Sequence, residues 1–339
     1  MRFFLKSVIT LIGLILFLLC ALRVFSDYKT AEAERLYPAQ GKFIQADGLK
    51  MHYVRKGSGR PVVLIHGSFG SVNDFTFSIF DRAVSLYDVT AIDRAGHGYS
   101  ERSGKPMDLF DHARVLREVL RSLGIQKPVI AGHSLGAGVA LAYAQAYPED
   151  AAALVLLAGY VTPYEGPPRW IHRAPAWPVI GKVYENTLVQ PLGHYFQDQI
   201  ARRVFSAGVV LPEGYLEAAG ALARRPRHFS ANAEDIRLLP SGLDKLREGF
   251  AKMTLPVIYL AADNDAIAPM QRHAESLARL LPSAEILLAP GAGHQPSFTA
   301  PGKVLEALDL AWRRADERLT PSPKEPSANP PELLELPLR

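Results

Sequence analysis

Short apolar, β-branched runs recur along this 339-residue chain between stretches of helical periodicity, and this alternation leaves few possible folds. Each run has the length and composition of a strand that is buried on both faces. The runs lie at 43–46, 51–55, 61–65, 89–92, 129–131, 154–157, 257–260 and 286–288, and the helical patterns at 108–123, 135–146, 269–281 and 302–316. The pattern predicts an α/β domain with a mainly parallel sheet that helices cover on both faces.

We expect the first thirty residues to lie outside the fold. An almost uninterrupted apolar run over 7–22 is preceded by Arg2 and Lys6 and ends at Arg23. With its flanking apolar residues the run has about 20 residues, the length that a helix needs to cross the hydrocarbon core of a membrane. A cleaved signal peptide has a similar start, but no small-x-small cleavage site follows here. The sequence therefore predicts an uncleaved transmembrane anchor over 3–25.

The net charge of the chain argues against nucleic acid as a partner, and its cysteine content argues against disulfides in the remaining domain. The net charge is only +4, and no stripe of basic residues is interleaved with aromatic ones, so nucleic acid is not an expected partner. The single cysteine, Cys20, lies in the apolar run, so the soluble part can form no disulfide. Basic residues lie on both sides of the anchor and barely discriminate between its two orientations. A short N-terminal tail usually stays in the cytoplasm, which favours an extracytoplasmic domain.

The rest of the chain divides by composition. Residues 26–41 are polar and predict a stalk between the anchor and a folded domain over 42–318. From about 160 to 250 there are no comparable strand runs, but many prolines and aromatic residues. Such an insertion predicts a helical cap over an apolar cleft, with a helical decoration that binds nothing as the alternative. Residues 319–339 are proline-rich and polar, and we expect disorder there.

The pentapeptide Gly132-His133-Ser134-Leu135-Gly136 follows a strand run and begins a helical pattern. A nucleophile elbow requires this context of strand, turn and helix. Strand and helix come close together at such a turn, so the positions two residues away from the serine on either side must be small. The turn exposes the hydroxyl and directs the amides of the helix start at the reacting oxygen. Ser134 is therefore the predicted nucleophile.

A second loop, at 66–70 (HGSFG), follows an earlier strand, and in this architecture such a loop supplies the other oxyanion donor. We expect the backbone amides of Ser68 and Leu135 to form the oxyanion hole, with Phe69 as the alternative to Ser68. His66 is expected to order the loops through hydrogen bonds rather than to take part in catalysis.

The loop at 93–100 (DRAGHGYS) also follows a strand and is rich in polar side chains. We expect it to be a structural turn, in which Asp93 and Arg94 hold neighbouring loops. Its glycines, Gly96 and Gly98, allow the tight backbone geometry that such a turn needs.

A serine hydroxyl needs a base that takes its proton and an acid that orients the base. Among the ten histidines, His294 stands out because it lies in a glycine-rich loop just after the last strand run. The acid should follow the preceding strand, where Asp263 and Asp265 are both candidates. Asp265 is favoured because it lies further out on the loop, before the residues that begin the next helix. The chain order Ser134, Asp265, His294 is the one expected of a nucleophile-elbow fold.

With these residues, the sequence resembles the α/β-hydrolase superfamily in its capped, serine-nucleophile branch. The resemblance covers residues 43–316, through the motifs at 66–67, 93–100 and 132–136 and through Asp265 and His294. It implies an eight-stranded, mostly parallel sheet, catalysis without a cofactor, and an acyl-enzyme on the serine. No metal site or phosphate-binding loop is visible in the sequence.

The expected activity is hydrolysis of a carboxylic ester of a lipophilic or aromatic small molecule, because the insertion is aromatic and the anchor apolar. Epoxide hydrolases and haloalkane dehalogenases resemble this chain in cap and loops, but they carry aspartate at the position of Ser134. Carbon–carbon bond hydrolases, perhydrolases and acyltransferases use the same triad and form one alternative. A non-catalytic ligand-binding protein on a hydrolase fold is the alternative of another class.

Overall fold

The computed structural model describes residues 1–163, 168–205 and 208–319. Its central element is a sheet in the order β1-β2-β4-β3-β5-β6-β7-β8. β2 is antiparallel to both of its neighbours, and every other pair of adjacent strands is parallel. The strands are β1 (Lys42–Ala46), β2 (Leu49–Lys56), β3 (Pro61–Ile65), β4 (Asp88–Ile92), β5 (Val129–His133), β6 (Ala153–Leu157), β7 (Val257–Ala262) and β8 (Glu285–Ala289). The predicted eight-stranded, mostly parallel sheet is confirmed, and each predicted strand run lies in it.

Parallel pairing brings the carboxyl ends of six strands to one edge of the sheet. Ile65 at the end of β3 pairs with Ile92 of β4 and with Gly132 of β5. Ala262 at the end of β7 pairs with Ala289 at the end of β8. The loops that carry the predicted site residues begin at or just beyond these positions, so residues far apart in the sequence meet at this edge.

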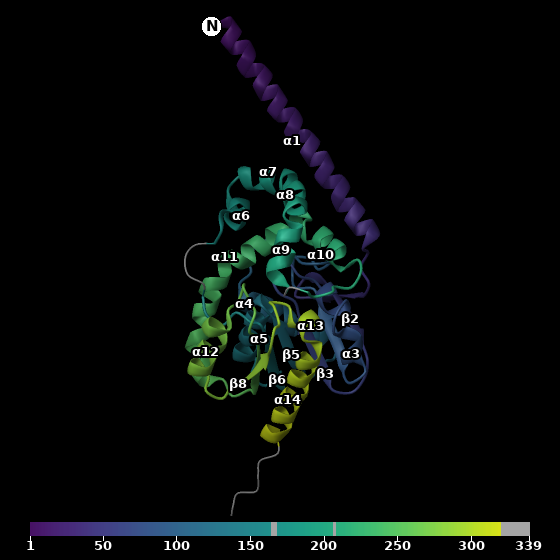
Figure 1. Cartoon of the computed structure of the whole chain (residues 1–339), viewed down its shortest axis with the longest axis vertical. Coiled ribbons are helices and arrows are strands. Elements are labelled where there is room, and N and C mark those ends of the chain that lie inside the picture. Colours follow the sequence, from purple (N-terminus) through teal and green to yellow (C-terminus); the bar gives the residue numbers. More distant parts are fainter. Residues whose placement is uncertain (164–167, 206–207, 320–339) are drawn as a thin grey trace, which may run out of the picture.

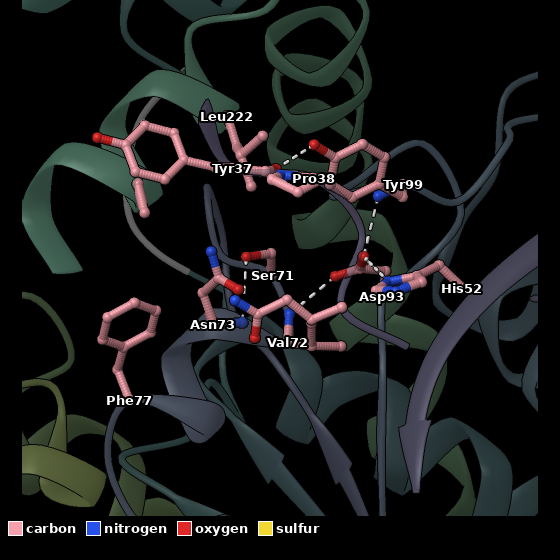
Figure 2. Close-up of a pocket in the computed structure, with 12 residues that line it drawn as sticks. Tyr37, Pro38, His52, Ser71, Val72, Asn73, Phe77, Asp93, Tyr99 and Leu222 are labelled. Carbon is pink, nitrogen blue, oxygen red and sulfur yellow. Dashed lines mark hydrogen bonds and ion pairs between the residues drawn. The ribbon is translucent and has the colours of Figure 1, made fainter. Parts of the chain in front are cut away.

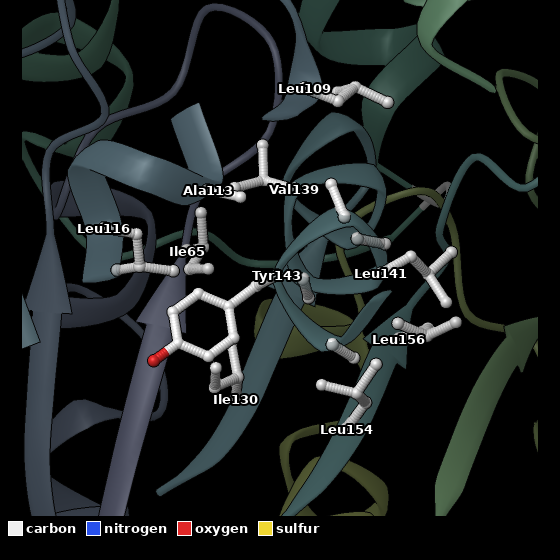
Figure 3. Packing of buried hydrophobic residues seen from close by; sticks show 14 of the residues in the cluster. Ile65, Leu109, Ala113, Leu116, Ile130, Val139, Leu141, Tyr143, Leu154 and Leu156 are labelled. Atoms are coloured by element: carbon white, nitrogen blue, oxygen red, sulfur yellow. The ribbon is translucent and has the colours of Figure 1, made fainter. Parts of the chain in front are cut away.

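Helices bury both faces of the sheet, which accounts for the near-continuous apolar strand runs. Ile65, Ile130 and Leu156 pack on one face beneath the helices that precede and follow β5 (Figure 3). Their neighbours along the strands pack on the other face. The helices of the first face are α4 (Leu109–Ser122), α5 (Leu135–Ala146) and α12 (Met270–Leu280), and those of the second are α3 (Phe80–Val84) and α14 (Pro301–Leu319). Burying each such aliphatic side chain stabilises the fold by ~1.5–3 kcal/mol.

The insertion between β6 and β7 is helical where it is described, and it lies over the edge where the parallel strands end (Figure 1). Its elements are α6 (Trp170–Arg173), η1 (Ala174–Ala176), α7 (Ile180–Thr187), α8 (Val189–Tyr195), α9 (Gln197–Val204), α10 (Tyr215–Ala223), α11 (Pro226–Gly249) and η2 (Phe250–Lys252). Two short helices of the core, α2 (Asn73–Thr76) and α13 (Pro296–Thr299), lie in the loops after β3 and β8. The insertion is therefore placed as a cap over the site edge.

The N-terminal segment is one continuous helix, α1 (Arg2–Leu36). Its apolar part has a mean hydropathy of 2.7 over 18 residues and no contact that buries it, so it is long and apolar enough to span a membrane. The helix continues through the polar stretch that the sequence predicts as a stalk, and there it packs against α7, α8 and α10 of the cap. Arg23, at the end of the apolar run, donates from Nη1 to Asn186 Oδ1 of α7 at 2.8 Å. Of the predicted disordered tail, only Leu319, the last residue of α14, is among the described residues.

A buried arginine joins α1, the cap and the core. Arg225 lies between α10 and α11 and is fully buried. Its Nη1 donates to Glu34 of α1 at 2.9 Å, and its Nη2 donates to the carbonyl of Gly98 in the loop after β4. Its Nε donates to the Leu222 carbonyl at 3.2 Å, and the guanidinium lies 4.9 Å from the ring centre of Tyr99.

Arg225→Ala is expected to lower the free energy of unfolding by ~2–4 kcal/mol, because it leaves buried carbonyl groups without a donor. Glu34→Gln is the matched control, since Glu34 is half-exposed and an exposed partner contributes less than ~1 kcal/mol. Urea unfolding of the full chain in detergent, followed by circular dichroism, measures both. Equal losses for the two variants would contradict the central role of the arginine.

Candidate active site

Ser134 lies in a strained turn between β5 and α5. Its backbone has φ 53° and ψ −117°, a conformation that non-glycine residues seldom adopt. The glycines on either side are required by close approach: a Cβ on Gly132 would lie 2.2 Å from the Gly136 carbonyl oxygen, and one on Gly136 would lie 2.5 Å from the Ile65 carbonyl oxygen. Strand, helix and the neighbouring strand β3 therefore meet around the serine, as the pentapeptide predicts.

The structure brings Ser134, His294 and Asp265 into one hydrogen-bonded line. His294 Nε2 lies 2.9 Å from Ser134 Oγ, and His294 Nδ1 lies 2.8 Å from Asp265 Oδ2. Asp265 follows β7 and His294 follows β8, so the two side chains come from the loops after adjacent strands, and His294 alone contacts Ser134. The relative exposure of Ser134 is 2% and that of His294 is 5%, so the line lies beneath the cap.

Asp265 is held ionised and in place by its neighbours. Its Oδ1 accepts hydrogen bonds from the amides of Ile267 at 2.7 Å and Ala268 at 2.8 Å. Burial opposes ionisation, but the hydrogen bond and charge of His294, together with these amides, outweigh it and lower the pKa of Asp265 below its ordinary value. The other candidate, Asp263, is exposed and accepts from the Gly291 amide at 2.6 Å, so it joins two loops and does not contact the histidine.

Two backbone amides next to Ser134 have no acceptor among the described residues: those of Ser68 and Leu135. Gly67 allows this arrangement, because a Cβ there would lie 2.8 Å from the Ser134 Cβ. The alternative donor, the Phe69 amide, is already engaged, since it donates to Asn232 Oδ1 of α11 at 2.7 Å. The geometry thus favours Ser68 over Phe69 as an oxyanion donor.

His66 and Arg94 order the loop that carries these donors. His66 Nδ1 lies 2.9 Å from the Gly67 carbonyl, and its Nε2 accepts from the Arg94 amide at 2.9 Å. Burial, reinforced by the Arg94 charge, lowers the pKa of His66 to about 3, so the ring is neutral. Arg94 in turn donates from Nε to the His66 carbonyl at 3.2 Å and from Nη2 to the Gly67 carbonyl at 3.1 Å.

The sequence did not predict that the cap helix α11 holds the loop at 66–70 in place. Arg94 Nη1 donates to Asp235 of α11, one turn beyond Asn232 on the same helix. His112 Nε2 at 3.1 Å and Arg102 Nη2 at 2.8 Å contact the other oxygen of Asp235. Burial opposes its ionisation, but these three cationic or polar partners hold the pKa of Asp235 well below its ordinary value. The three-residue spacing of Asn232 and Asp235 was the only signal in the sequence that they share a helix face.

A second carboxyl group lies beside the histidine loop. Asp74 of α2 is buried, and its Oδ1 accepts from the Tyr215 hydroxyl of α10 at 3.1 Å. Burial raises the pKa of Asp74 to about 7, although hydrogen bonds from Tyr215 and from Gln295, the residue after His294, oppose the shift. Asp74 is thus a point where the cap, the core and the histidine loop meet.

The cavity in Figure 2 lies apart from the serine. It is lined by the end of α1 and by residues of β2, α2 and α10, among them Tyr37, His52, Asn73 and Leu222. Its free space is about 30 Å³, which suits a few water molecules, whereas sites for small organic ligands measure ~300–1,000 Å³. Within the described ranges, no group of three or more histidine, cysteine, aspartate and glutamate side chains could hold a metal ion.

The sheet order, the strained serine after β5 and the helical cap define the α/β-hydrolase class of proteins. The family model described as "alpha/beta hydrolase fold" matches residues 60–301, and the chain belongs to this family.

Known proteins of several activities are similar to it. A non-heme haloperoxidase of Rhodococcus erythropolis is 26% identical, over 74% of this chain and 90% of its own. A 2-hydroxymuconate semialdehyde hydrolase of Pseudomonas putida is 29% identical, over 76% of this chain and 88% of its own. The solved structure of a membrane phospholipase A has a TM-score of 0.62 and 19% identity, and covers 93% of this chain and 99% of that one. The last likeness shows the fold alone.

The free energy of unfolding of the Asp74→Asn variant, compared with that of the wild type, is expected to be higher at pH 8 than at pH 5. The folded state holds a proton on Asp74 up to about pH 7, whereas the unfolded chain releases it near pH 4. Between these values, rising pH therefore favours unfolding of the wild type, by at most ~1.4 kcal/mol per pH unit. The asparagine variant lacks this slope. Melting temperatures of both proteins from pH 5 to 8 measure it, and a pH-independent difference between them would contradict the raised pKa.

Proposed function

We propose that this chain is a membrane-anchored serine hydrolase that cleaves carboxylic esters of lipophilic or aromatic molecules. The observation that carries the proposal is the line of hydrogen bonds from Ser134 through His294 to Asp265, next to two unengaged amides. A base within hydrogen-bond distance of a serine, oriented by a carboxylate, is the arrangement that activates a hydroxyl group as a nucleophile.

In the proposed reaction, Ser134 Oγ attacks the ester carbonyl carbon while His294 Nε2 accepts the hydroxyl proton. The amides of Ser68 and Leu135 stabilise the resulting oxyanion, and each such donor is typically worth ~100- to 1,000-fold in rate. Collapse of the intermediate breaks the ester bond, and the histidine returns the proton to the leaving alcohol. Water, deprotonated by His294, then attacks the acyl-serine; the bond from the acyl carbon to Ser134 Oγ breaks, the acid leaves, and His294 returns the proton to Ser134 Oγ. Asp265 keeps Nδ1 protonated and the ring oriented throughout.

The preference for a lipophilic substrate is supported by the side chains above the oxyanion loop. Phe69 lies 5.8 Å from Phe229 of α11 and 5.8 Å from His172 of α6, measured between ring centres. Phe229 in turn lies 5.9 Å from Tyr184 of α7. This aromatic cluster and the apolar anchor favour an ester with a long or aromatic acyl chain.

A second candidate activity is hydrolysis of a carbon–carbon bond in a vinylogous diketone. Ser134, His294 and Asp265 could catalyse this reaction as well. It is favoured by the 29% identity to a 2-hydroxymuconate semialdehyde hydrolase. Parallel assays with p-nitrophenyl esters of increasing chain length and with a vinylogous diketone separate the two. Faster turnover of the diketone would replace the ester proposal by this one.

Ser134→Ala and His294→Ala are each expected to abolish labelling by a fluorophosphonate probe and to lower kcat for a p-nitrophenyl ester by ~10⁴-fold or more, because either loss removes the activated hydroxyl. Membranes that contain the full chain serve for both measurements. A wild type that folds but stays unlabelled, or a Ser134→Ala variant that keeps its rate, would refute the mechanism.

Asp265→Asn is expected to lower kcat by ~10⁴-fold in the same assay, because the carboxylate no longer fixes the histidine tautomer. Asp263→Asn is its matched control, since among the described residues the one hydrogen bond of this side chain comes from the Gly291 amide, and the variant is expected to keep kcat within about twofold. The reverse result would assign the orienting role to Asp263.

Asn232→Ala is expected to lower kcat about tenfold with little change in KM, because the Phe69 amide loses its acceptor and the oxyanion loop its fixed position. Asp244→Ala is the control, as an exposed residue of the same helix. A purely structural role of Asn232 would instead lower the melting temperature and leave kcat unchanged.

A further inference from the structure

The outer edge of the cap carries large apolar side chains in solvent. We call this edge the cap crest and define it by Trp170, Trp177, Val179, Ile180 and Tyr195, all of which are exposed. Val179 is 77% exposed and Ile180 62%. The crest runs along α6, η1, α7 and α8, which contact one another in sequence. Exposed apolar residues that cluster in this way indicate a surface that binds a membrane or another protein.

The backbone at the crest is shaped to expose these residues. Val179 has φ 60° and ψ −58°, and the Ile180 amide donates to the Pro178 carbonyl at 2.6 Å, which together make a γ-turn. A β-branched residue with positive φ is a genuine outlier. The turn places two apolar side chains, those of Val179 and Ile180, on the cap surface, where most of each is exposed to solvent.

The anchor helix fixes where the crest lies. α1 packs on α7, α8 and α10, its two buried residues, Ser26 and Ala33, lie in its polar end, and its apolar part projects past the cap (Figure 1). The transition falls at Arg23, which bonds to Asn186 of α7. When the apolar part of α1 occupies the hydrocarbon core, α7 is therefore held at the level of the lipid headgroups, and the crest faces the same bilayer.

The charge of this part of the cap suits a lipid surface. The segment 168–205 contains five basic residues and two acidic ones, a net charge of +3. One of the two acidic residues, Glu185, is buried, whereas all five basic residues are exposed: Arg169, Arg173, Lys182, Arg202 and Arg203. Basic side chains at a membrane surface bind anionic headgroups, and tryptophan and tyrosine prefer the interfacial layer.

We propose that the cap crest docks into the headgroup layer of the membrane that α1 spans, so that the cap is a second membrane contact. The inference rests on the membrane anchor of the proposed function. Because the cap also covers Ser134, an ester dissolved in that lipid layer reaches the site through the cap and does not cross bulk water.

Fluorescence quenching of the full chain in vesicles tests the contact directly. The chain has three tryptophans, of which Trp170 and Trp177 belong to the crest and Trp312 lies on α14, away from the cap (Figure 1). Three variants, each with one tryptophan kept and two changed to phenylalanine, are incorporated into phosphatidylcholine and phosphatidylglycerol vesicles with brominated acyl chains. We expect emission from Trp170 and from Trp177 to fall at least twofold and that from Trp312 to stay unchanged. Equal emission changes at all three positions would overturn the proposal.

An activity measurement tests the consequence. Val179→Asp combined with Ile180→Asp is expected to slow hydrolysis of a long-chain ester in vesicles at least tenfold, and to leave hydrolysis of a water-soluble short-chain ester unchanged. Leu86→Asp, which alters an exposed apolar residue just before β4 at the opposite edge of the sheet, is the matched control and should change neither rate. Equal rates of the crest variant and the wild type on vesicles would contradict delivery through the crest.

The outcomes separate this inference from the proposals on which it rests. Protein that an alkaline carbonate wash removes from vesicles would overturn both the anchor and the crest contact. Protein that stays anchored, but whose crest tryptophans are not quenched, would overturn the crest contact alone. Quenched crest tryptophans in a protein that cleaves no ester would support the contact and refute the ester activity.

Discussion

The close approach of β5, α5 and β3 at Ser134 is the constraint on which the rest of the site depends. No side chain fits at Gly132 or Gly136, because carbonyl oxygens occupy the space within 2.5 Å of where a Cβ would lie. That crowding forces the serine into its strained conformation and places its hydroxyl beyond the strand end. It also brings the start of α5 close to the end of β3 and the loop after it, where a Cβ on Gly67 would lie 2.8 Å from the Ser134 Cβ. A strained backbone persists only where the surrounding packing over-determines it, and the two buried apolar layers of the sheet supply that packing.

The cap belongs to the site as well as covering it. Asn232 and Asp235, one turn apart on α11, reach the loop at 66–70 from above, the first through the Phe69 amide and the second through Arg94. A buried charge pair of this kind adds little to stability compared with apolar packing, but it specifies position, because each charge left alone in the interior would be costly. The loop that carries Ser68 is thus fixed from two sides, by the sheet below and by α11 above.

The sequence predicts those parts of the fold and the site that depend on residues close together in the chain, and not those that depend on tertiary contacts. The elbow, the strand runs and the loop that carries His294 depend on neighbours in the chain, so residue type and spacing predicted them. The choice of Asp265 over Asp263 was also local, because only Asp265 lies far enough along the loop to meet the histidine. By contrast, the contacts of Asn232, Asp235 and Arg225 depend on how the cap docks on the core, and no local pattern encodes that. The continuation of α1 through the predicted stalk was missed for a similar reason, since its polar residues are held by packing on the cap.

The same tertiary contacts make α1 part of the fold and not a flexible tether. Arg225 binds Glu34 of α1 and the Gly98 carbonyl, and the Tyr99 hydroxyl donates to the Tyr37 carbonyl just after the helix. The next contacts lead inward, because Asp93 accepts from the Tyr99 amide at 2.9 Å and from the Val72 amide, just after the loop at 66–70, at 2.8 Å. A helix that packs on α7, α8 and α10 of the cap and makes these part-buried polar contacts cannot swing freely about its end. In the proposed membrane-anchored protein, the direction of α1 therefore sets the direction in which the cap faces, and a mobile linker in place of these contacts would leave that direction undefined.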